Sequence, residues 1–465
     1  MRKNDALLSH IDWPLFIAFI SLLIFGMATV YSVAFNEEHP NIFAFSEKYG
    51  KQMLWLGISL FLGLLIFLID VDIYRKFAVP IYIFTLILLV IVLFMPPING
   101  ARAWIGIGSM GIQPAEFAKI STALLLSKYI SGLMIKHQTT NTVLTAVGII
   151  MGPAILVALQ PDAGTLVVFS SFLFVMYREG MTFDPIILKI VNRIPGINLK
   201  STWVGNHFIP LLFIVVVLAV LTLIIGEVEF SIGFLPGIII KGSTGIIITL
   251  AFLALLAFLY IRRFGTKRDR GSLTFIIIFG FVFMTALSSS VSFVFSKLAR
   301  HQKDRIEMVL GLKEDPNGKD YNRNRAMAAV GSGGAFGKGY KEASVSSVES
   351  NHVPESETDF IFCPFAEEWG FLGSVFLVFI YLFMLMRIIF IAERQRSSFN
   401  RIYAYCVAMI LFYHFAINIG MNIGFVPVIG IPLPFFSYGG SSIMSFCIMM
   451  FLLLKLDSQR KDVLR

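Results

Sequence analysis

The stretch WPLFIAFISLLIFGMATVYSVAF, residues 13–35, decides the fold class of this chain. It contains no charged side chain and exceeds the roughly 20 apolar residues that a helix needs to cross a hydrocarbon core of about 30 Å. Arg2 and Lys3 precede it, but the run is too long for the core of a signal peptide, and no small-residue cleavage site follows it. We therefore expect a retained membrane-spanning helix.

Similar apolar runs recur along the whole chain. Hydrophobic residues make up 57% of the 465 residues and charged residues only 14%, a composition that excludes an ordinary soluble domain. The sequence predicts an all-α fold, a single polytopic membrane domain over residues 1–465 built as a helical bundle of about 12 transmembrane helices. The predicted spans lie near residues 13–35, 50–69, 77–96, 114–133, 142–159, 163–178, 207–226, 237–261, 273–296, 365–387, 402–422 and 440–455.

Positive charge is distributed unevenly between the two sets of loops, although the net charge is only +9. If the N-terminus is cytoplasmic, one set carries most lysines and arginines, and the short loops on the other side hold only Lys48, Lys51 and Arg102. The positive-inside rule then places both termini in the cytoplasm. The basic excess is expected to face anionic lipid headgroups, not nucleic acid. The longest loop, about residues 297–362, falls on the extracytoplasmic side, where long ordered loops tend to carry function.

A glycine-rich stretch, Gly331-Ser-Gly-Gly-Ala-Phe-Gly-Lys-Gly339, lies in that loop. It differs from a phosphate-binding P-loop, because Ser332 replaces the first glycine and Gly339 follows Lys338 where Ser or Thr is required. We therefore reject nucleotide binding. Two interpretations remain open: backbone N–H groups that face an anionic ligand, or a flexible turn.

Two charged residues lie inside a predicted span. Glu116 and Lys119 are three residues apart and so share one helix face. Charges inside a membrane are costly and usually functional, so the pair predicts a polar pocket near the outer surface; a purely structural ion pair is the alternative. Asp162 is expected at the mouth of the same bundle, where it either balances Lys119 or Arg102 or caps the helix that follows.

Two further segments frame the outer loop. Carboxylates concentrate in Asn351–Phe362 and at Glu367-Glu368; such a cluster can act as a general base or hold a divalent cation, or it is a solvated acidic loop. Prolines and glycines are dense in Pro427–Ser442. They break a helix at membrane depth, which is tolerated only where protein or a cavity covers the freed backbone. This segment is predicted to be re-entrant and to line a site.

Together these motifs resemble the SEDS family (shape, elongation, division, sporulation), and the likeness runs from the first span to the last. Glu367-Glu-Trp-Gly370 resembles the elongation (RodA) branch more than the division (FtsW) branch. The other matching pieces are Ala101-Arg-Ala-Trp104, Gln113-Pro-Ala-Glu116 with Lys119, Gln160-Pro-Asp162 with Gly164-Thr165, His301-Gln302, Arg305-Ile306, Gly331-Ser-Gly-Gly334 with Gly337-Lys-Gly339, Thr358-Asp-Phe-Ile-Phe362, and Pro432-Leu-Pro434 with Ser437-Tyr-Gly-Gly-Ser-Ser442.

The resemblance implies an enzyme of the bacterial cytoplasmic membrane. The implied activity is that of an inverting peptidoglycan glycosyltransferase that polymerises lipid II into β-1,4 glycan strands during cell-wall elongation. The donor would be a glycan on undecaprenyl pyrophosphate, and the site would open on the extracytoplasmic side. The implied partner is a class B penicillin-binding protein, the transpeptidase that cross-links the strands. No cofactor is implied with certainty, and a divalent cation at the leaving group is left open.

The resemblance also implies roles for particular residues. Asp359 would be the general base. Lys119 and Arg102 would face the pyrophosphate, and Glu116 and Asp162 would position them, so that the four line one cavity beside Pro427–Ser442. The remaining expected substrate-binding residues are Trp104, Gln113, Lys338, Ser437 and Ser441.

Three features depart from the family pattern. The family usually has ten spans, which implies a two-helix insertion within residues 180–271 whose spans pack at the periphery and whose loop Glu227–Phe234 faces outward. Glu357 stands where the family has a histidine, and its like charge is expected to disfavour ionisation of Asp359 and shift activity toward higher pH. Tyr321–Ala326 differs from the Gln-Ser pattern of the family.

The residues alone leave two rival functions open. Buried charges and broken helices also mark transport paths, so a transporter or flippase of lipid-linked cell-wall precursors is the alternative. A scaffold whose spans only dock partners would tolerate neutralisation of its buried charges.

Overall fold

The structure is a computed structural model of the whole chain. It describes residues 11–35, 41–97, 102–106, 111–133, 138–193, 200–225, 229–231, 239–264, 270–297, 307, 319–346, 353–426 and 428–460. The chain divides into two compact units, Met1–Lys200 with Tyr321–Arg465, and Ser201–Asp320. The motif residues Ala101, His301, Gln302, Arg305, Ile306 and Pro427 lie outside the described residues.

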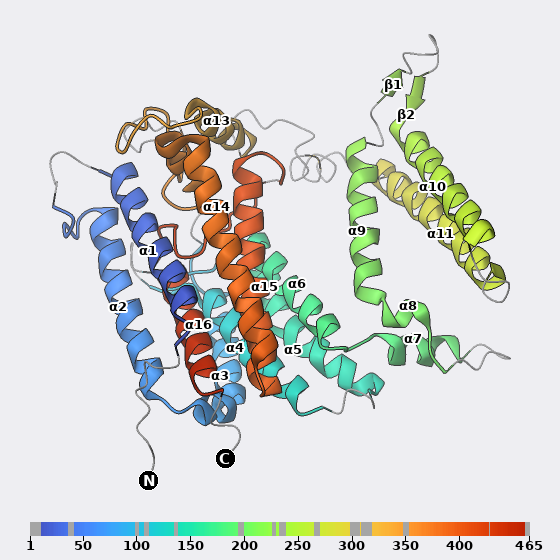
Figure 1. Cartoon of the computed structure of the whole chain (residues 1–465), viewed down its shortest axis with the longest axis horizontal. Coiled ribbons are helices and arrows are strands. Elements are labelled where there is room, and N and C mark those ends of the chain that lie inside the picture. The colour runs from blue at the N-terminus through green and yellow to red at the C-terminus, as the bar shows by residue number, and fades with distance from the viewer. Residues whose placement is uncertain are drawn as a thin grey trace. The chain divides into compact units, whose positions relative to one another are not determined.

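The first unit is a bundle of long helices that run side by side (Figure 1). Its helix α16 packs between α2, α4 and α15, and α4 also contacts α3, α5 and α6. The helices are α1 (Trp13–Val33), α2 (Lys48–Leu68), α3 (Val71–Val92), α4 (Pro114–Ser131), α5 (Thr140–Leu159), α6 (Ala163–Arg178), α7 (Asp184–Val191), α13 (Lys319–Ser332), α14 (Phe362–Arg394), α15 (Ser398–Asn422) and α16 (Gly440–Ser458).

Short polar side chains set the starts of several helices. The Asp12 carboxylate accepts a hydrogen bond from Leu15 N (3.1 Å), and Asp70 does the same for Asp72 N (3.1 Å). Thr139 and Thr142 form a capping box at the start of α5. These caps satisfy backbone donors that the first turn of a helix leaves without partners.

The second unit contains three further long helices and one hairpin. Helix α11 packs against both α9 and α10, and Thr222 Oγ1 lies 3.1 Å from Ser288 Oγ between α9 and α11. Strands β1 and β2 pair antiparallel over three residues each. The elements are α8 (Trp203–Asn206), α9 (Phe208–Ile225), β1 (Glu229–Ser231), β2 (Ile239–Lys241), α10 (Gly242–Phe264) and α11 (Arg270–Lys297).

Each of the twelve predicted spans coincides with a helix, so the all-α bundle is confirmed, apart from the short hairpin. Among the described residues, nine helices are long and apolar enough to cross a membrane, and α6 and part of α9 are shorter apolar helices. Helix α4 is not among the nine, and it carries the charged residues Glu116, Lys119 and Lys128. The protein is therefore a polytopic membrane protein, and the count of 12 spans stays a prediction.

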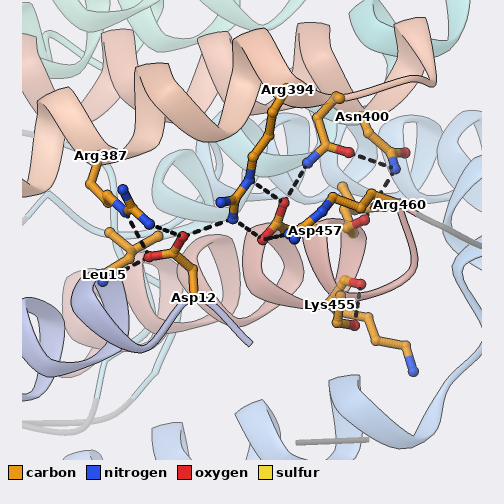
Figure 2. Close-up of polar contacts among 11 residues, drawn as sticks. Asp12, Leu15, Arg387, Arg394, Asn400, Lys455, Asp457 and Arg460 are labelled. Carbon is orange, nitrogen blue, oxygen red and sulfur yellow. Dashed lines mark hydrogen bonds and ion pairs between the residues drawn. The ribbon is translucent and has the colours of Figure 1, made fainter. Parts of the chain in front are cut away.

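A cluster of arginines and aspartates ties together the ends of three helices (Figure 2). Asp12, before α1, accepts hydrogen bonds from Arg387 (2.9 and 2.8 Å) and Arg394 (2.7 Å) of α14. Asp457 of α16 pairs with Arg394 and with Arg460 (3.0 Å). Burial alone would raise the pKa of Asp12, but the bonds from Arg387 and Leu15 and the charges of Arg394 and Arg387 outweigh it, so the pKa is lowered. We call this group the arginine–aspartate cluster.

Candidate functional site

The loop that carries Asp359 is held through its main chain. Three consecutive carbonyls accept hydrogen bonds from residues far along the chain. The carbonyl of Asp359 accepts from Asn418 Nδ2 (2.8 Å) and Asn422 Nδ2 (3.3 Å), and that of Thr358 accepts from Ser437 Oγ (2.7 Å). The preceding carbonyl, of Glu357, accepts from Tyr438 N (2.9 Å). The half-buried Asp359 is therefore positioned by α15 and by the non-helical residues 428–439 before α16, which we call the broken segment.

The Asp359 carboxylate faces Gly430 in the broken segment. A Cβ placed on Gly430 would lie 3.2 Å from Asp359 Oδ2, and Gly430 has φ +71°, a conformation that only glycine adopts at little cost. On the other side, a Cβ on Gly164 of α6 would lie 2.8 Å from the Gly430 carbonyl oxygen. The start of α6, the broken segment and the Asp359 loop are thus stacked in direct contact, and the two glycines allow this close approach.

Asp162, at the start of α6, caps its own helix. Its Oδ1 accepts from Thr165 N (2.9 Å) and its Oδ2 accepts from Gln113 Nε2 (2.9 Å). The backbone N–H of Gln113 in turn donates to Ser441 Oγ (2.9 Å). Of the two sequence-based alternatives, the structure has the helix cap, and it joins Asp162, Gln113 and Ser441 into one chain of contacts beside the broken segment.

Glu116 and Lys119 form a fully buried ion pair. Lys119 Nζ lies 2.9 Å from Glu116 Oε1 and 2.8 Å from His414 Nε2, and Ser445 Oγ donates to Glu116 Oε2 (3.0 Å). The side chain of Lys119 has 0% exposure. Direct contact of its ammonium with a pyrophosphate would require this cluster to open, so the observed arrangement fits the structural ion pair better than the polar pocket.

His414 belongs to a polar stripe on α15 for which the sequence predicted no role in the site. His414, Asn418 and Asn422 are spaced four residues apart and so lie on one helix face. His414 Nδ1 lies 3.1 Å from the Pro432 carbonyl, and Asn418 Nδ2 donates to the Ile431 carbonyl (2.7 Å). The stripe connects the Lys119 pair to the Asp359 loop through the broken segment. Its spacing within an apolar span was the signal that could have identified it.

The glycine-rich stretch docks onto the start of α14. Lys338 N and Gly339 N donate to the carbonyls of Glu367 and Glu368 (both 3.0 Å). Helix α14 is kinked at Gly370 (φ 66°, ψ −164°), and a Cβ there would lie 2.2 Å from Gly337 N. These backbone N–H groups are therefore used inside the protein, which favours neither the anion site nor the flexible turn.

The Glu367 carboxylate organises the segment after the glycines. It accepts from the backbone N–H groups of Ser344 (3.0 Å), Val345 (3.0 Å) and Ser346 (2.9 Å). Lys338 Nζ lies 2.5 Å from Glu367 Oε1, with its side chain 29% exposed. Lys338, expected at the substrate, is thus held in place by an ion pair and still reaches the surface.

The other predicted residues lie around this centre. Arg102 is exposed and donates to the Leu93 carbonyl (3.2 Å), and no ion pair joins it to Asp162 in the described part of the chain. The Trp104 ring packs over Gly111, where a Cβ would lie 3.2 Å from it. Ser437 anchors the Asp359 loop, as described above.

Glu357 forms an ion pair with Lys48 at the start of α2. The Glu357 side chain is 9% exposed and that of Lys48 is 45% exposed. The expectation that Glu357 places an uncompensated negative charge beside Asp359 therefore needs revision, because the lysine balances that charge.

A divalent cation finds no ligand set here. In the described ranges, no three His, Cys, Asp or Glu side chains are grouped so as to hold a metal ion. The cation that the resemblance leaves open at the leaving group is therefore assigned no ligands.

Comparison with known proteins identifies the family. Residues 13–204 and 271–462 match the model of the FtsW/RodA/SpoVE family, described as cell cycle proteins. The chain belongs to this SEDS family. The match leaves out residues 205–270, which contain α9, the hairpin and α10.

Relatives in this family cover nearly the whole chain. The peptidoglycan glycosyltransferase RodA of Treponema pallidum is 28% identical over 462 residues, which covers 97% of this chain and 98% of that protein. The peptidoglycan glycosyltransferase MrdB of Escherichia coli K12 is 27% identical over 454 residues, with 97% and 95% covered.

Solved structures share the fold of this SEDS protein. A chain from a study of how a peptidoglycan synthase complex coordinates polymerization and crosslinking aligns with a TM-score of 0.63 at 22% identity, covering 97% of this chain and 99% of that one. The rod shape determining protein RodA of Thermus thermophilus aligns with a TM-score of 0.55 at 21% identity, with 98% and 99% covered. At these identities the likeness supports the fold alone.

Proposed function

We propose that this SEDS protein is a peptidoglycan glycosyltransferase that polymerises lipid II into β-1,4 glycan strands during cell-wall elongation. Relatives over almost its full length are named peptidoglycan glycosyltransferases. The structural observation that best supports the proposal is the Asp359 loop. In this loop, α15 and the broken segment fix one half-buried aspartate through its main chain.

Asp359 acts as the general base in this proposal. The 4-hydroxyl of the acceptor sugar must lose its proton as it attacks the anomeric carbon of the donor, and a fixed carboxylate can accept that proton. Attack on the face opposite the departing pyrophosphate inverts the configuration and gives the β-1,4 bond. The clamped main chain keeps the carboxylate in place, and precise orientation of this kind contributes strongly to rate.

Positive charge is needed where the pyrophosphate departs. Arg102 and Lys338 are the two predicted cations whose side chains reach the surface, and we assign the leaving group to them. Lys119, together with Glu116 and His414, is assigned instead to the framework beneath the broken segment, because its ammonium is fully buried. This revises the role expected for Lys119 from the resemblance.

The proposed setting is the bacterial cytoplasmic membrane, with both termini in the cytoplasm and the Asp359 loop on the outer side. The distribution of lysines and arginines supports this orientation. We propose a class B penicillin-binding protein as the transpeptidase partner, because the resemblance to the SEDS family implies one; a chain that shares this fold comes from a study of a peptidoglycan synthase complex. We also propose that α9 and α10 are an insertion into the family fold, because the family match omits residues 205–270.

The test is a polymerisation assay with the purified full-length chain in detergent and labelled lipid II. Wild-type protein should give glycan strands, and Asp359→Asn should lose at least about 100-fold in rate, as expected for removal of a general base, while its thermal stability stays unchanged. Glu355→Gln is the matched control, because Glu355 is an exposed carboxylate in the same loop. An Asp359→Asn protein that polymerises at the normal rate would remove Asp359 from the mechanism.

The same assay distinguishes a polymerase from the alternative, a flippase of lipid-linked precursors. If the wild-type protein leaves lipid II as monomer but carries a fluorescent lipid II across liposome membranes, the chain is a flippase. Strand formation in detergent, where there are no two compartments, can only come from a polymerase.

A further inference from the structure

We propose that an apolar groove between α1 and α2 binds the hydrocarbon chain of a lipid with a phosphate headgroup, and that Lys341 holds the headgroup. The cavity has a volume of about 400 Å³, within the range of about 300–1,000 Å³ typical of ligand pockets. Aliphatic side chains such as Ile24, Met27, Leu56 and Leu60 line it, and tyrosines contribute the aromatic part of its wall.

The groove has the length of one membrane leaflet. Its lining on α1 runs from Ile20 to Tyr31, which at about 1.5 Å per residue is roughly 16 Å, or about half of a hydrocarbon core of about 30 Å. The lining on α2 runs from Met53 to Leu60, in the half of α2 that follows its start at Lys48. Both stretches therefore belong to the end of the bundle near Tyr340.

The segment after the glycine-rich stretch closes that end. Tyr340 lines the groove, and its hydroxyl donates to the Ala28 carbonyl (3.0 Å). The next residue, Lys341, is fixed by its backbone N–H, which donates to Glu368 Oε1 (3.2 Å). The groove thus ends beside Lys341, whose backbone is bonded to Glu368 of α14.

The Lys341 ammonium is available to an anion. Its Nζ lies 4.5 Å from the centroid of Tyr31 and 3.6 Å from that of Phe35, so the aromatic rings steer the exposed side chain to the end of the groove. Among the described residues, no carboxylate forms an ion pair with it. Burial, followed by the charges of Glu368 and Tyr31, raises the pKa of Tyr340 to about 12, so the phenol beside Lys341 stays neutral.

A lipid fits this site better than a peptide. The Ala28 carbonyl in its wall already accepts a hydrogen bond from Tyr340, and the mostly apolar lining offers few partners to the N–H and C=O groups of a peptide backbone. An apolar chain of one-leaflet length with an anionic head matches both the lining and the cation. This inference uses none of the residues assigned to polymerisation and goes beyond that function.

Photolabelling of the full-length protein in phosphatidylcholine nanodiscs tests the site. The probes are a monoalkyl phosphate with a diazirine in its chain and the neutral monoalkyl glycerol with the same chain. We expect the phosphate probe to label residues 20–31 and 53–60 in preference to the lipid-facing residues of α3. Leu60→Trp, which fills the groove, should remove this preference for both probes. Ile24→Trp serves the same purpose if Leu60→Trp fails to fold, because Ile24 is 62% exposed.

Substitution of Lys341 tests the headgroup contact. Lys341→Gln should weaken labelling by the phosphate probe about fivefold, as expected for one lysine at an anionic lipid headgroup, and should leave the neutral probe unaffected. Lys51→Gln, which removes a lysine at the same end of α2, is the control and should change neither. Even labelling of all lipid-facing helices would overturn the groove, and equal labelling by the two probes would overturn the role of Lys341. Persistent labelling by a chain that cannot polymerise lipid II would refute the proposed function alone.

Discussion

Two aspartates at different places in the bundle are held by different sets of contacts. The Asp359 residue is half-buried and anchored through its main-chain carbonyl, which accepts from Asn418 and Asn422. The Asp457 side chain has 0% exposure and is held through its carboxylate by Arg394, Arg460 and Gln395. Neutralising Asp457 therefore removes bonds that hold helices together, whereas neutralising Asp359 removes none of its main-chain anchors. The difference predicts that stability and activity separate between the two sites.

Loss of the buried lysine should have the largest effect on stability. Lys119→Met leaves the Glu116 carboxylate buried without its cation, which typically costs about 3–5 kcal/mol of unfolding free energy. Because His414 links Lys119 to the broken segment beside Asp359, activity should fall as well. Unfolding in detergent and lipid II polymerisation measure the two losses.

The double variant Glu116→Gln/Lys119→Met sharpens this test. It leaves no uncompensated charge and should regain much of the stability. A Lys119→Met protein as stable as the wild type would contradict the buried ion pair.

Asp457→Asn should destabilise the protein by about 2 kcal/mol, through loss of hydrogen bonds between charged groups. The cost is smaller than for Lys119 because the Arg394 and Arg460 side chains are 26% exposed and can be hydrated. The rate per folded molecule should stay normal, in contrast to Asp359→Asn. An Asp457→Asn protein with normal stability but no polymerisation would contradict the structural role that we assign to Asp457.

Gly430→Ala tests how closely the Asp359 carboxylate is packed. The positive φ costs about 1–2 kcal/mol for any residue with a Cβ, and the new methyl group would displace Asp359 Oδ2 by a few tenths of an ångström. We expect about a tenfold loss in rate, because small misplacements of a reacting group are expensive. Gly334→Ala is the control, since Gly334 also has positive φ (+58°) but no atom within 4 Å of its Cβ position. If both variants lose similar stability but Gly430→Ala loses much more rate, the close contact between Gly430 and Asp359 is supported. Equal losses in rate would contradict it.

The helices of the bundle could be predicted from the sequence because the apolar run that forms each span is a local feature of the chain. Runs of apolar residues locate the helices without knowledge of their neighbours, and the three-residue spacing of Glu116 and Lys119 placed them on one face, as observed. The cap role of Asp162 was also among the local alternatives.

The partners that complete the site come from far along the chain and could not be predicted in this way. His414 is 295 residues from Lys119, and Glu357 is 309 residues from Lys48. Pairings of this kind depend on which helices pack together, and no periodicity in one segment records them. The docking of the glycine-rich stretch onto the Gly370 kink likewise needs both segments in place.

Lys48→Gln should have the smallest effect on stability, and its main effect should be on the pH profile. An ion pair whose lysine is 45% exposed contributes at most about 1 kcal/mol. Without Lys48, however, the Glu357 carboxylate becomes an uncompensated negative charge two residues from Asp359. Like charge disfavours the ionised form of the base, so higher pH is needed to ionise it, and the acidic limb of polymerisation should move to higher pH.

The direction and salt dependence of this shift identify its cause. Lys48→Gln/Glu357→Gln removes both charges and should return the acidic limb to its wild-type position, and Lys51→Gln, in the same turn of α2, should not move it. The shift should shrink as ionic strength rises, because salt screens charges near the surface. An acidic limb that stays in place in Lys48→Gln at low salt would mean that Glu357 does not influence Asp359. In that case the replacement of the usual histidine by Glu357 serves to bind Lys48 and fix the start of α2 against the Asp359 loop.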